Sequence, residues 1–195
     1  MKNAFIMSLI LFSHLSFAAQ TTAAFDFKLI HHRQDENWII DKIEVYNQKQ
    51  QLLQQITGFR SQVLGFDIDM IELEIEDMNF DGYLDIRLPQ TLPIEGGIYF
   101  YYWFYDPEQQ LFIRNKILEN FRSPEFNNHS QTIKVYSHQT EKQYRVNHYR
   151  YQTSKKLQLF LQQAYKQVGR HWLEAILERD KKGEMVLVEQ NLVSD

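Results

Sequence analysis

The segment Ile71-Glu-Leu-Glu-Ile-Glu-Asp-Met-Asn-Phe-Asp-Gly-Tyr-Leu-Asp-Ile-Arg-Leu88 decides the fold that we expect of this chain. Apolar and charged residues alternate on both sides of its centre, at the period of β-strands, whose successive side chains point to opposite faces. Between the two runs, Gly82 and its acidic neighbours favour a tight turn, since glycine accepts backbone angles that other residues resist. The segment therefore predicts a β-hairpin closed by the loop 77–85.

The loop has the residue spacing of a calcium site. Oxygen-bearing side chains occupy positions 1, 3, 5 and 9 of the loop: Asp77, Asn79, Asp81 and Asp85. Gly82 takes the position of the sharp turn, and Tyr83 would contribute its backbone carbonyl, because calcium prefers six to eight oxygen ligands. These residues predict a calcium ion as cofactor. The alternative is an acidic turn without metal, because Asn, Asp and Gly favour turns by themselves.

The flanks of the loop distinguish it from a calcium sensor. An EF-hand carries a bidentate Glu at position 12 and joins two helices, whereas this chain has Leu88 there and joins two strands. We therefore expect a structural ion that fixes a hairpin, and not one that opens and closes a helix pair. Water or another group must complete the ligand shell.

The N-terminus predicts export. Lys2 gives a positive start, residues 4–17 form an apolar run, and Ser16-Phe17-Ala18 presents small residues where a signal peptidase cleaves. We expect a signal peptide at 1–18, cleavage after Ala18, a single β domain at 19–195 and a periplasmic location. The apolar run is short for a membrane span, so no transmembrane anchor is expected after cleavage.

Composition excludes several classes of protein. The chain has no cysteine, which excludes a disulfide framework and a lipid-modified N-terminal cysteine. Its formal net charge of −4 and lack of a basic cluster argue against nucleic acid as a partner. No phosphate-binding glycine loop, nucleophile elbow or HExxH motif occurs, so we expect no catalytic residue and no enzyme activity.

The rest of the chain predicts an all-β protein of antiparallel hairpins. Its 14 Phe, 11 Tyr and 3 Trp suit the pleated, half-buried surfaces of sheets. The run Tyr99–Tyr105 is aromatic throughout, as a strand buried on both faces could be, although exposed members could also contact a partner. Loops are expected at 58–66 and 89–97. Further short strands recur at a spacing typical of sandwiches, barrels or propellers: 25–30, 38–46, 51–56, 111–114, 132–136, 144–151, 172–178 and 185–189.

The segment 157–168 fits both the helical and the strand period. Residues 157–168 place apolar side chains at helical spacing, but Leu157, Leu159 and Leu161 also alternate as in a strand. We predict a strand, because the hairpin that follows, with its turn Asp180-Lys-Lys-Gly183, is most simply reached by a continuing meander.

Several short motifs stand together between about residues 70 and 190. They are Asp77-x-Asn79-x-Asp81-Gly82-Tyr83-x-Asp85, Tyr102-Trp103-x-x-Asp106-Pro107 with Phe112, Leu118-Glu119, Ser123-Pro124-Glu125-Phe126, Lys156-Leu157-x-Leu159 and Gly183-x-Met185-Val186-x-Val188. In these motifs the chain resembles a family of periplasmic, calcium-binding, β-propeller-like immunity proteins. It departs from the family at the N-terminus, where members often carry a lipobox cysteine or a longer linker.

The resemblance implies both an architecture and a partner. Family members have an incomplete β-propeller-like arrangement and inhibit lysozyme-like peptidoglycan hydrolases that secretion systems deliver in interbacterial competition. The expected partner is therefore a cognate hydrolase, and no residue is assigned to its binding. The alternative is a calcium-stabilised adhesion or scaffold module of the envelope. Adhesive propellers repeat the calcium loop, whereas this chain has it once.

Overall fold

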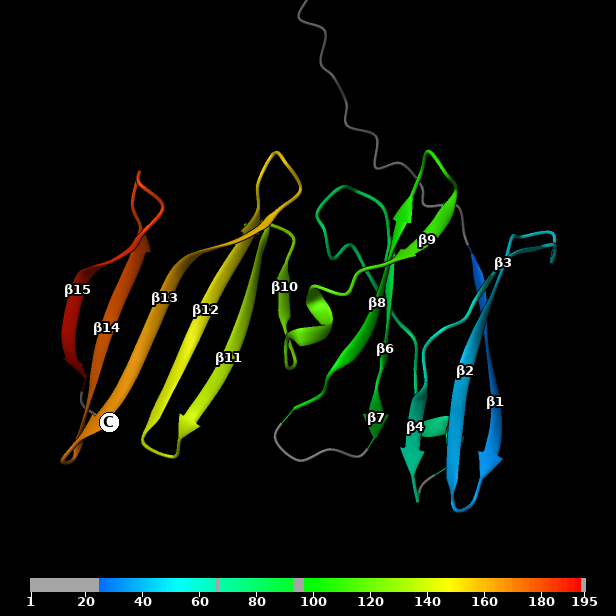
Figure 1. Ribbon diagram of the computed structural model, residues 1–195, viewed down its shortest axis with the longest axis horizontal. Helices are drawn as coiled ribbons and strands as arrows, with labels where there is room; N and C mark the ends of the chain where they lie inside the picture. The colour runs from blue at the N-terminus through cyan, green and yellow to red at the C-terminus, as the bar shows by residue number, and fades with distance from the viewer. Residues whose placement is uncertain (1–24, 66, 93–96, 194–195) are drawn as a thin grey trace, which may run out of the picture.

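The computed structural model describes residues 25–65, 67–92 and 97–193, and the expected signal peptide and its cleavage site lie outside these ranges. The described chain forms three β-sheets that stand side by side along the long axis (Figure 1). All strand pairs are antiparallel except one short parallel pair. The all-β class is confirmed, and the arrangement is compatible with an incomplete β-propeller.

The first sheet contains five strands and the second contains four. The strands of the first sheet are β1 (Asp26–Gln34), β2 (Asn37–Tyr46), β3 (Leu52–Ile56), β4 (Ser61–Leu64) and β7 (Thr91–Leu92), of which β4 and β7 are the parallel pair. The strands of the second sheet are β5 (Glu74–Glu76), β6 (Asp85–Pro89), β8 (Phe100–Asp106) and β9 (Leu111–Arg114).

The third sheet is a continuous meander of six strands. They are β10 (Glu125–Asn127), β11 (Thr132–Thr140), β12 (Gln143–Tyr151), β13 (Leu157–Val168), β14 (His171–Arg179) and β15 (Met185–Val193). Two short 3-10 helices, η1 (Ile68–Met70) and η2 (Leu118–Asn120), complete the described elements. The strand predicted at 157–168 is confirmed, because both of its edges are paired, with β12 and with β14.

The predicted hairpin forms, since Glu76 pairs with Asp85 across the loop. Its first strand begins only at Glu74, because residues 71–73, which follow η1, do not pair with β6. The loops expected at 58–66 and 89–97 are wrong in part, because they contain β4 and β7. These strands are too short to show a period, and their pairing depends on distant residues. The buried Ser61 hydroxyl donates to the carbonyl of Pro89 at 2.6 Å.

Strand β8 separates two hydrophobic cores, as predicted for a strand buried on both faces. Trp103 packs with β1–β6 residues such as Ile43 in the first core, whereas Phe100 and Tyr102 pack with Met78 in the second. Since these three aromatic side chains are buried, they are core residues and not partner contacts. Tyr99, at 40% exposed, lies just before β8.

The side chain of Gln54 also connects the first two sheets. The Gln54 amide donates to the carbonyl of Phe112 at 2.9 Å and accepts from the Phe112 N–H at 2.8 Å, so β3 is tied to β9. We expect Gln54→Ala to lower the free energy of unfolding by about 1 to 2 kcal/mol, because both backbone groups lose a half-buried partner. Urea denaturation checks this, with Gln55→Ala, an exposed neighbour, as the matched control. Equal losses in both variants would contradict it.

The far part of the third sheet has no core. No residue of β13, β14 or β15 is buried, although half-buried apolar side chains occur on all three strands and exposed ones on β13 and β15. A sheet normally buries one face against another layer. Within the described chain these strands form a single layer.

Candidate calcium loop

The backbone of the loop 77–85 turns through two left-handed residues. Gly82 has a φ of 89°, as its position in the motif predicts, and Phe80 has a φ of 63°. A non-glycine residue in this region is strained unless its surroundings hold it there. Phe80 is held by the second core, where its ring lies 6.4 Å from that of Tyr151. The conformation of the loop is therefore fixed by packing as well as by glycine.

Three of the predicted ligand side chains gather around the amides of the loop. Asp77 accepts hydrogen bonds from the N–H of Asp81 at 3.2 Å and of Gly82 at 2.9 Å, through separate oxygens. The Asn79 amide oxygen accepts from the same Asp81 N–H at 3.0 Å. One donor shared by two oxygens places Asp77 and Asn79 side by side.

The Asp81 carboxylate completes this group. Its Oδ1 accepts from the N–H of Tyr83 at 3.0 Å, and its Oδ2 accepts from the Asn79 amide at 2.8 Å. Oxygen atoms from three alternate residues thus lie on one short loop, as the spacing predicts. Tyr83, whose backbone carbonyl is a predicted ligand, lies two residues after Asp81.

Asp85 has a different environment from the other predicted ligands. It is fully buried at the start of β6, where Oδ2 accepts from the N–H of Met78 at 3.0 Å and Oδ1 accepts from the N–H of Tyr105 at 2.9 Å. The pKa of Asp85 is raised to about 8, mainly by burial; the two N–H donors lower it, and the nearby charges of Asp81 and Asp77 raise it. Asp85 therefore braces the loop against β8.

These groups suit calcium in kind, because they are hard oxygen donors of carboxylate and amide type. In the described chain no lysine or arginine forms an ion pair with them, so like charges accumulate without compensation. No group of three or more His, Asp or Glu side chains in the described ranges could hold a metal ion alone. An ion would therefore depend on the carboxylates of Asp77 and Asp81, on the amide oxygen of Asn79 and on the carbonyl of Tyr83, because the raised pKa of Asp85 keeps that carboxyl group protonated at neutral pH in the absence of an ion.

Two cavities lie in this part of the protein, and one of them adjoins the loop. One of about 320 Å³ has Asn79 and Asp81 among its lining residues, together with Gln152 and Lys155 from the β12–β13 turn. Tyr151, which also lines it, has a buried hydroxyl without a hydrogen-bond partner in the described chain. Burial, and the charge of nearby Asp85, raise the pKa of the Tyr151 phenol, so it stays a neutral donor.

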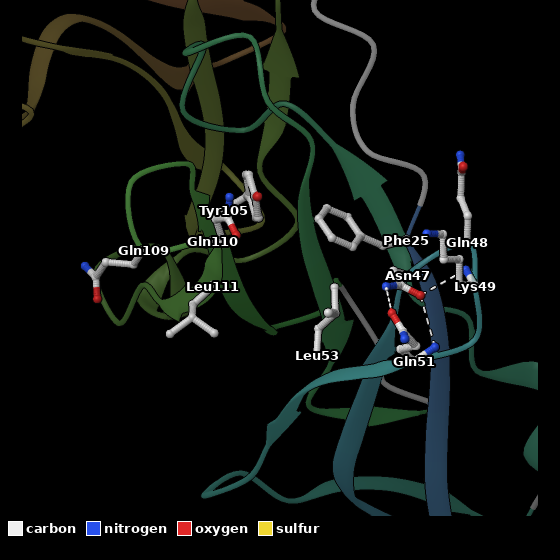
Figure 2. Close-up of a pocket in the computed structure, with 10 residues that line it drawn as sticks. All are labelled: Phe25, Asn47, Gln48, Lys49, Gln51, Leu53, Tyr105, Gln109, Gln110 and Leu111. Atoms are coloured by element: carbon white, nitrogen blue, oxygen red, sulfur yellow. Dashed lines mark hydrogen bonds between the residues drawn. The ribbon is translucent and has the colours of Figure 1, made fainter.

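The other cavity, of about 610 Å³, has no residue of the loop 77–85 in its lining, but one of its lining residues, Tyr105, contacts the ring of Tyr83. The Tyr83 ring lies 5.8 Å from Tyr105, which lies 5.2 Å from Phe25. Figure 2 shows Phe25 between Tyr105 and the turn that contains Asn47 and Gln51. The amides of Asn47 and Gln51 bond to each other, so they close the turn and are not free for a ligand.

An aromatic cluster on the third sheet was missed by sequence reasoning. Tyr144 and Tyr165 stack at 4.5 Å, Trp172 meets Tyr144 edge-on at 5.6 Å, and the Tyr165 hydroxyl donates to Glu174 at 2.6 Å. These half-buried residues come from three strands, and only the register of β12, β13 and β14 brings them together. Half-buried Tyr and Trp on an open sheet are suitable anchors for a partner.

No protein-family model and no curated protein matches this chain. None of the helices in the described ranges is long and apolar enough to cross a membrane. A solved structure, that of a Xanthomonas type IV secretion system related protein, matches with a TM-score of 0.62 and 13% sequence identity. The match covers 85% of this chain and 88% of that chain. At this identity the likeness shows a shared fold, which extends over most of both proteins.

Proposed function

We propose that this chain is a periplasmic immunity protein that binds and inhibits a lysozyme-like peptidoglycan hydrolase, and that a structural calcium ion stabilises it. The observation that carries the proposal is the fold shared, over 85% of the chain, with a protein related to a bacterial secretion system. The loop 77–85 and the motifs that resemble calcium-binding immunity proteins support it independently.

Inhibition of this kind needs rigid loops more than it needs chemistry. Lysozyme-like enzymes hold two carboxyl groups on either side of a cleft, so a protein that fills the cleft stops hydrolysis. Loops that are already ordered lose less conformational entropy on binding. The Asp85 carboxyl group attaches the loop 77–85 to β8 through hydrogen bonds from the N–H groups of Met78 and Tyr105. Gln152 and Lys155 line the cavity beside the loop. Calcium would stiffen the exposed side of the same loop.

The test is a lysis assay with residues 19–195, the chain expected after cleavage, and a cognate lysozyme-like peptidoglycan hydrolase. We expect an equimolar amount to suppress the clearing of a peptidoglycan suspension in calcium, and chelator to restore clearing. Undiminished lysis with this protein in molar excess and calcium present would reject inhibition. The alternative hypothesis, an adhesion or scaffold module of the envelope, would then remain.

A matched pair of variants connects inhibition to the loop. Asp81→Asn should inhibit less than the unmodified chain when calcium is limiting. Asp106→Asn is the control, because Asp106 also accepts two backbone N–H groups in an exposed turn, those of Glu108 and Gln109, but lies outside the calcium motif. Equal inhibition by the two variants would show that inhibition does not depend on the loop 77–85.

A further inference from the structure

The turn between β12 and β13 lies next to the candidate calcium loop. It consists of residues 152–156, and Lys155 from this turn lines the same cavity of about 320 Å³ as Asn79 and Asp81. In Figure 1 the β12–β13 turn, the loop that precedes β6 and the turn between β8 and β9 lie toward the same end of the molecule. This end therefore presents connecting segments of the second and third sheets beside one another.

Both ends of the β12–β13 turn are anchored in the second hydrophobic core. Tyr151 and Leu157, which flank the turn, pair with each other and pack against that core. Within the turn, the N–H of Gln152 donates to the carbonyl of Lys156 at 2.9 Å, and the N–H of Lys155 donates to the carbonyl of Gln152 at 2.8 Å. A segment that is already ordered loses less conformational entropy when it binds a partner. The β13–β14 and β14–β15 turns lack such an anchor, because no residue of these strands is buried.

An aromatic contact connects the calcium loop to this turn. Phe80, at a φ of 63° in the loop, places its ring 6.4 Å from the ring of Tyr151. Tyr151 is the last residue of β12, directly before the turn. The conformation of the loop therefore bears on the position of the turn, and an ion that fixes the loop would also help to fix the turn.

The charge at this end of the molecule depends on whether the loop holds an ion. Lys155 forms no salt bridge within the described ranges. It lies near Asp106, since the N–H of Gln109 chiefly holds the pKa of that carboxyl below its usual value and the charge of Lys155 lowers it further. Asp77, Asp81 and Asp106 together oppose the single positive charge of Lys155, so these four groups carry −2 without an ion and 0 with Ca²⁺. The ion would therefore remove the field that repels a carboxylate.

We propose that the β12–β13 turn enters the cleft of the hydrolase and that the Lys155 ammonium group pairs there with the catalytic carboxyl groups. This inference rests on the proposed function and names the contact by which this protein inhibits. Two carboxyl groups flank the scissile bond in a lysozyme-like cleft, so an exposed cation on a narrow turn matches the cleft in charge. Close charge pairs across an interface fix its specificity, and loss of one partner weakens binding. Calcium then has a second role, because it cancels the negative charge around Lys155.

A pair of asparagine variants tests the role of Lys155. Lys155 has a φ of 58°, which asparagine accepts more readily than most residues, so Lys155→Asn removes the charge without adding strain. Lys156→Asn is the control, because it removes the same charge from the next residue, which is not among the residues that line the cavity. In calorimetric titration of a cognate lysozyme-like hydrolase in calcium, we expect Lys155→Asn to raise the Kd at least about tenfold. Lys156→Asn should change the Kd by less than about twofold, and equal changes would overturn the proposal.

Variants of the hydrolase identify the group that Lys155 contacts. Each of its two catalytic carboxyl groups is replaced in turn by the corresponding amide, which keeps the shape of the cleft and removes the charge. Against the amide variant that has lost the partner of Lys155, Lys155→Asn should weaken binding by less than about twofold, because the interaction is already absent. A tenfold loss against both amide variants would show that Lys155 does not contact the catalytic carboxyl groups, and would overturn the proposal.

The outcomes for this inference and for the proposed function are distinct. Lys155→Asn should keep the Tm of the unmodified chain in calcium and in chelator, because Lys155 is exposed and lies outside the loop 77–85. If its Tm were lower, Lys155→Gly, which accepts the same φ, would take its place. An unmodified chain and a Lys155→Asn variant that inhibit equally would overturn this inference and leave the proposed function standing. An unmodified chain that does not bind the hydrolase would overturn both.

Discussion

Asp81→Asn is expected to remove most of the thermal stabilisation that the proposed calcium ion would give to this protein. The asparagine keeps an oxygen that can accept from the Tyr83 N–H, but the substitution removes one of the two carboxylates, those of Asp77 and Asp81, that would hold the ion. An ion present at about 100 times its dissociation constant stabilises a protein by about 2.7 kcal/mol. For a chain of this length that is a rise in Tm of about 5 to 10 °C.

Circular dichroism melts in calcium and in chelator measure this difference. The unmodified chain should melt at a higher temperature in calcium, whereas the Tm of Asp81→Asn should be nearly the same in both conditions. The control Asp106→Asn should keep the full calcium response. If Asp81→Asn shifted the Tm equally with calcium and with chelator, the loop would be an acidic turn that holds no ion.

Asp85→Ala is expected to lower the free energy of unfolding by about 2 to 5 kcal/mol, because it leaves two backbone N–H groups without a partner, each at about 1 to 3 kcal/mol. These are the groups of Met78 and Tyr105, which the carboxylate joins across the base of the loop. Urea denaturation in chelator measures the loss without a contribution from calcium. Asp41→Ala is the control, since that side chain is about half exposed on β2. A loss as small as that of the control would show that the brace contributes little.

The same carboxyl predicts how stability depends on pH in chelator. The pKa of Asp85 in the folded chain is about 8, above the ordinary value of 3.8, so the folded state holds a proton that the unfolded state releases. Its contribution is complete below about pH 4 and is lost as the pH rises toward 8 and beyond, by an amount on the order of 5 kcal/mol. Asp85→Asn, which does not titrate, should remove this part of the slope. An identical slope in the two proteins would contradict the assignment.

Much of the fold can be predicted from local patterns. Alternation of apolar and polar residues marks the long strands and the hairpin at 77–85, and the choice of strand for 157–168 is correct because its neighbours continue the same meander. Strands β4 and β7 were missed, since two to four residues contain too little of a period to detect. They exist because β2 and the buried Ser61 hydroxyl hold them in place.

The candidate site, too, is only partly predictable from local sequence patterns. Spacing alone predicts that Asp77, Asn79 and Asp81 lie together, because their hydrogen bonds are to atoms within the loop; their role as calcium ligands stays a prediction. The brace from Asp85 to Tyr105 depends on how β6 pairs with β8, and no local pattern contains that register. The cluster of Tyr144, Tyr165 and Trp172 was missed for the same reason.

Strand β8 makes the two cores respond together. Its alternate side chains are shared between them, so a shift of this strand that loosens one core also disturbs the other. The Asp85 carboxylate attaches the loop 77–85 to the N–H of Tyr105, on this same strand. A cation bound by the loop would therefore help to fix the position of β8. Because both hydrophobic cores pack against this strand, the cation would stabilise the packing of both.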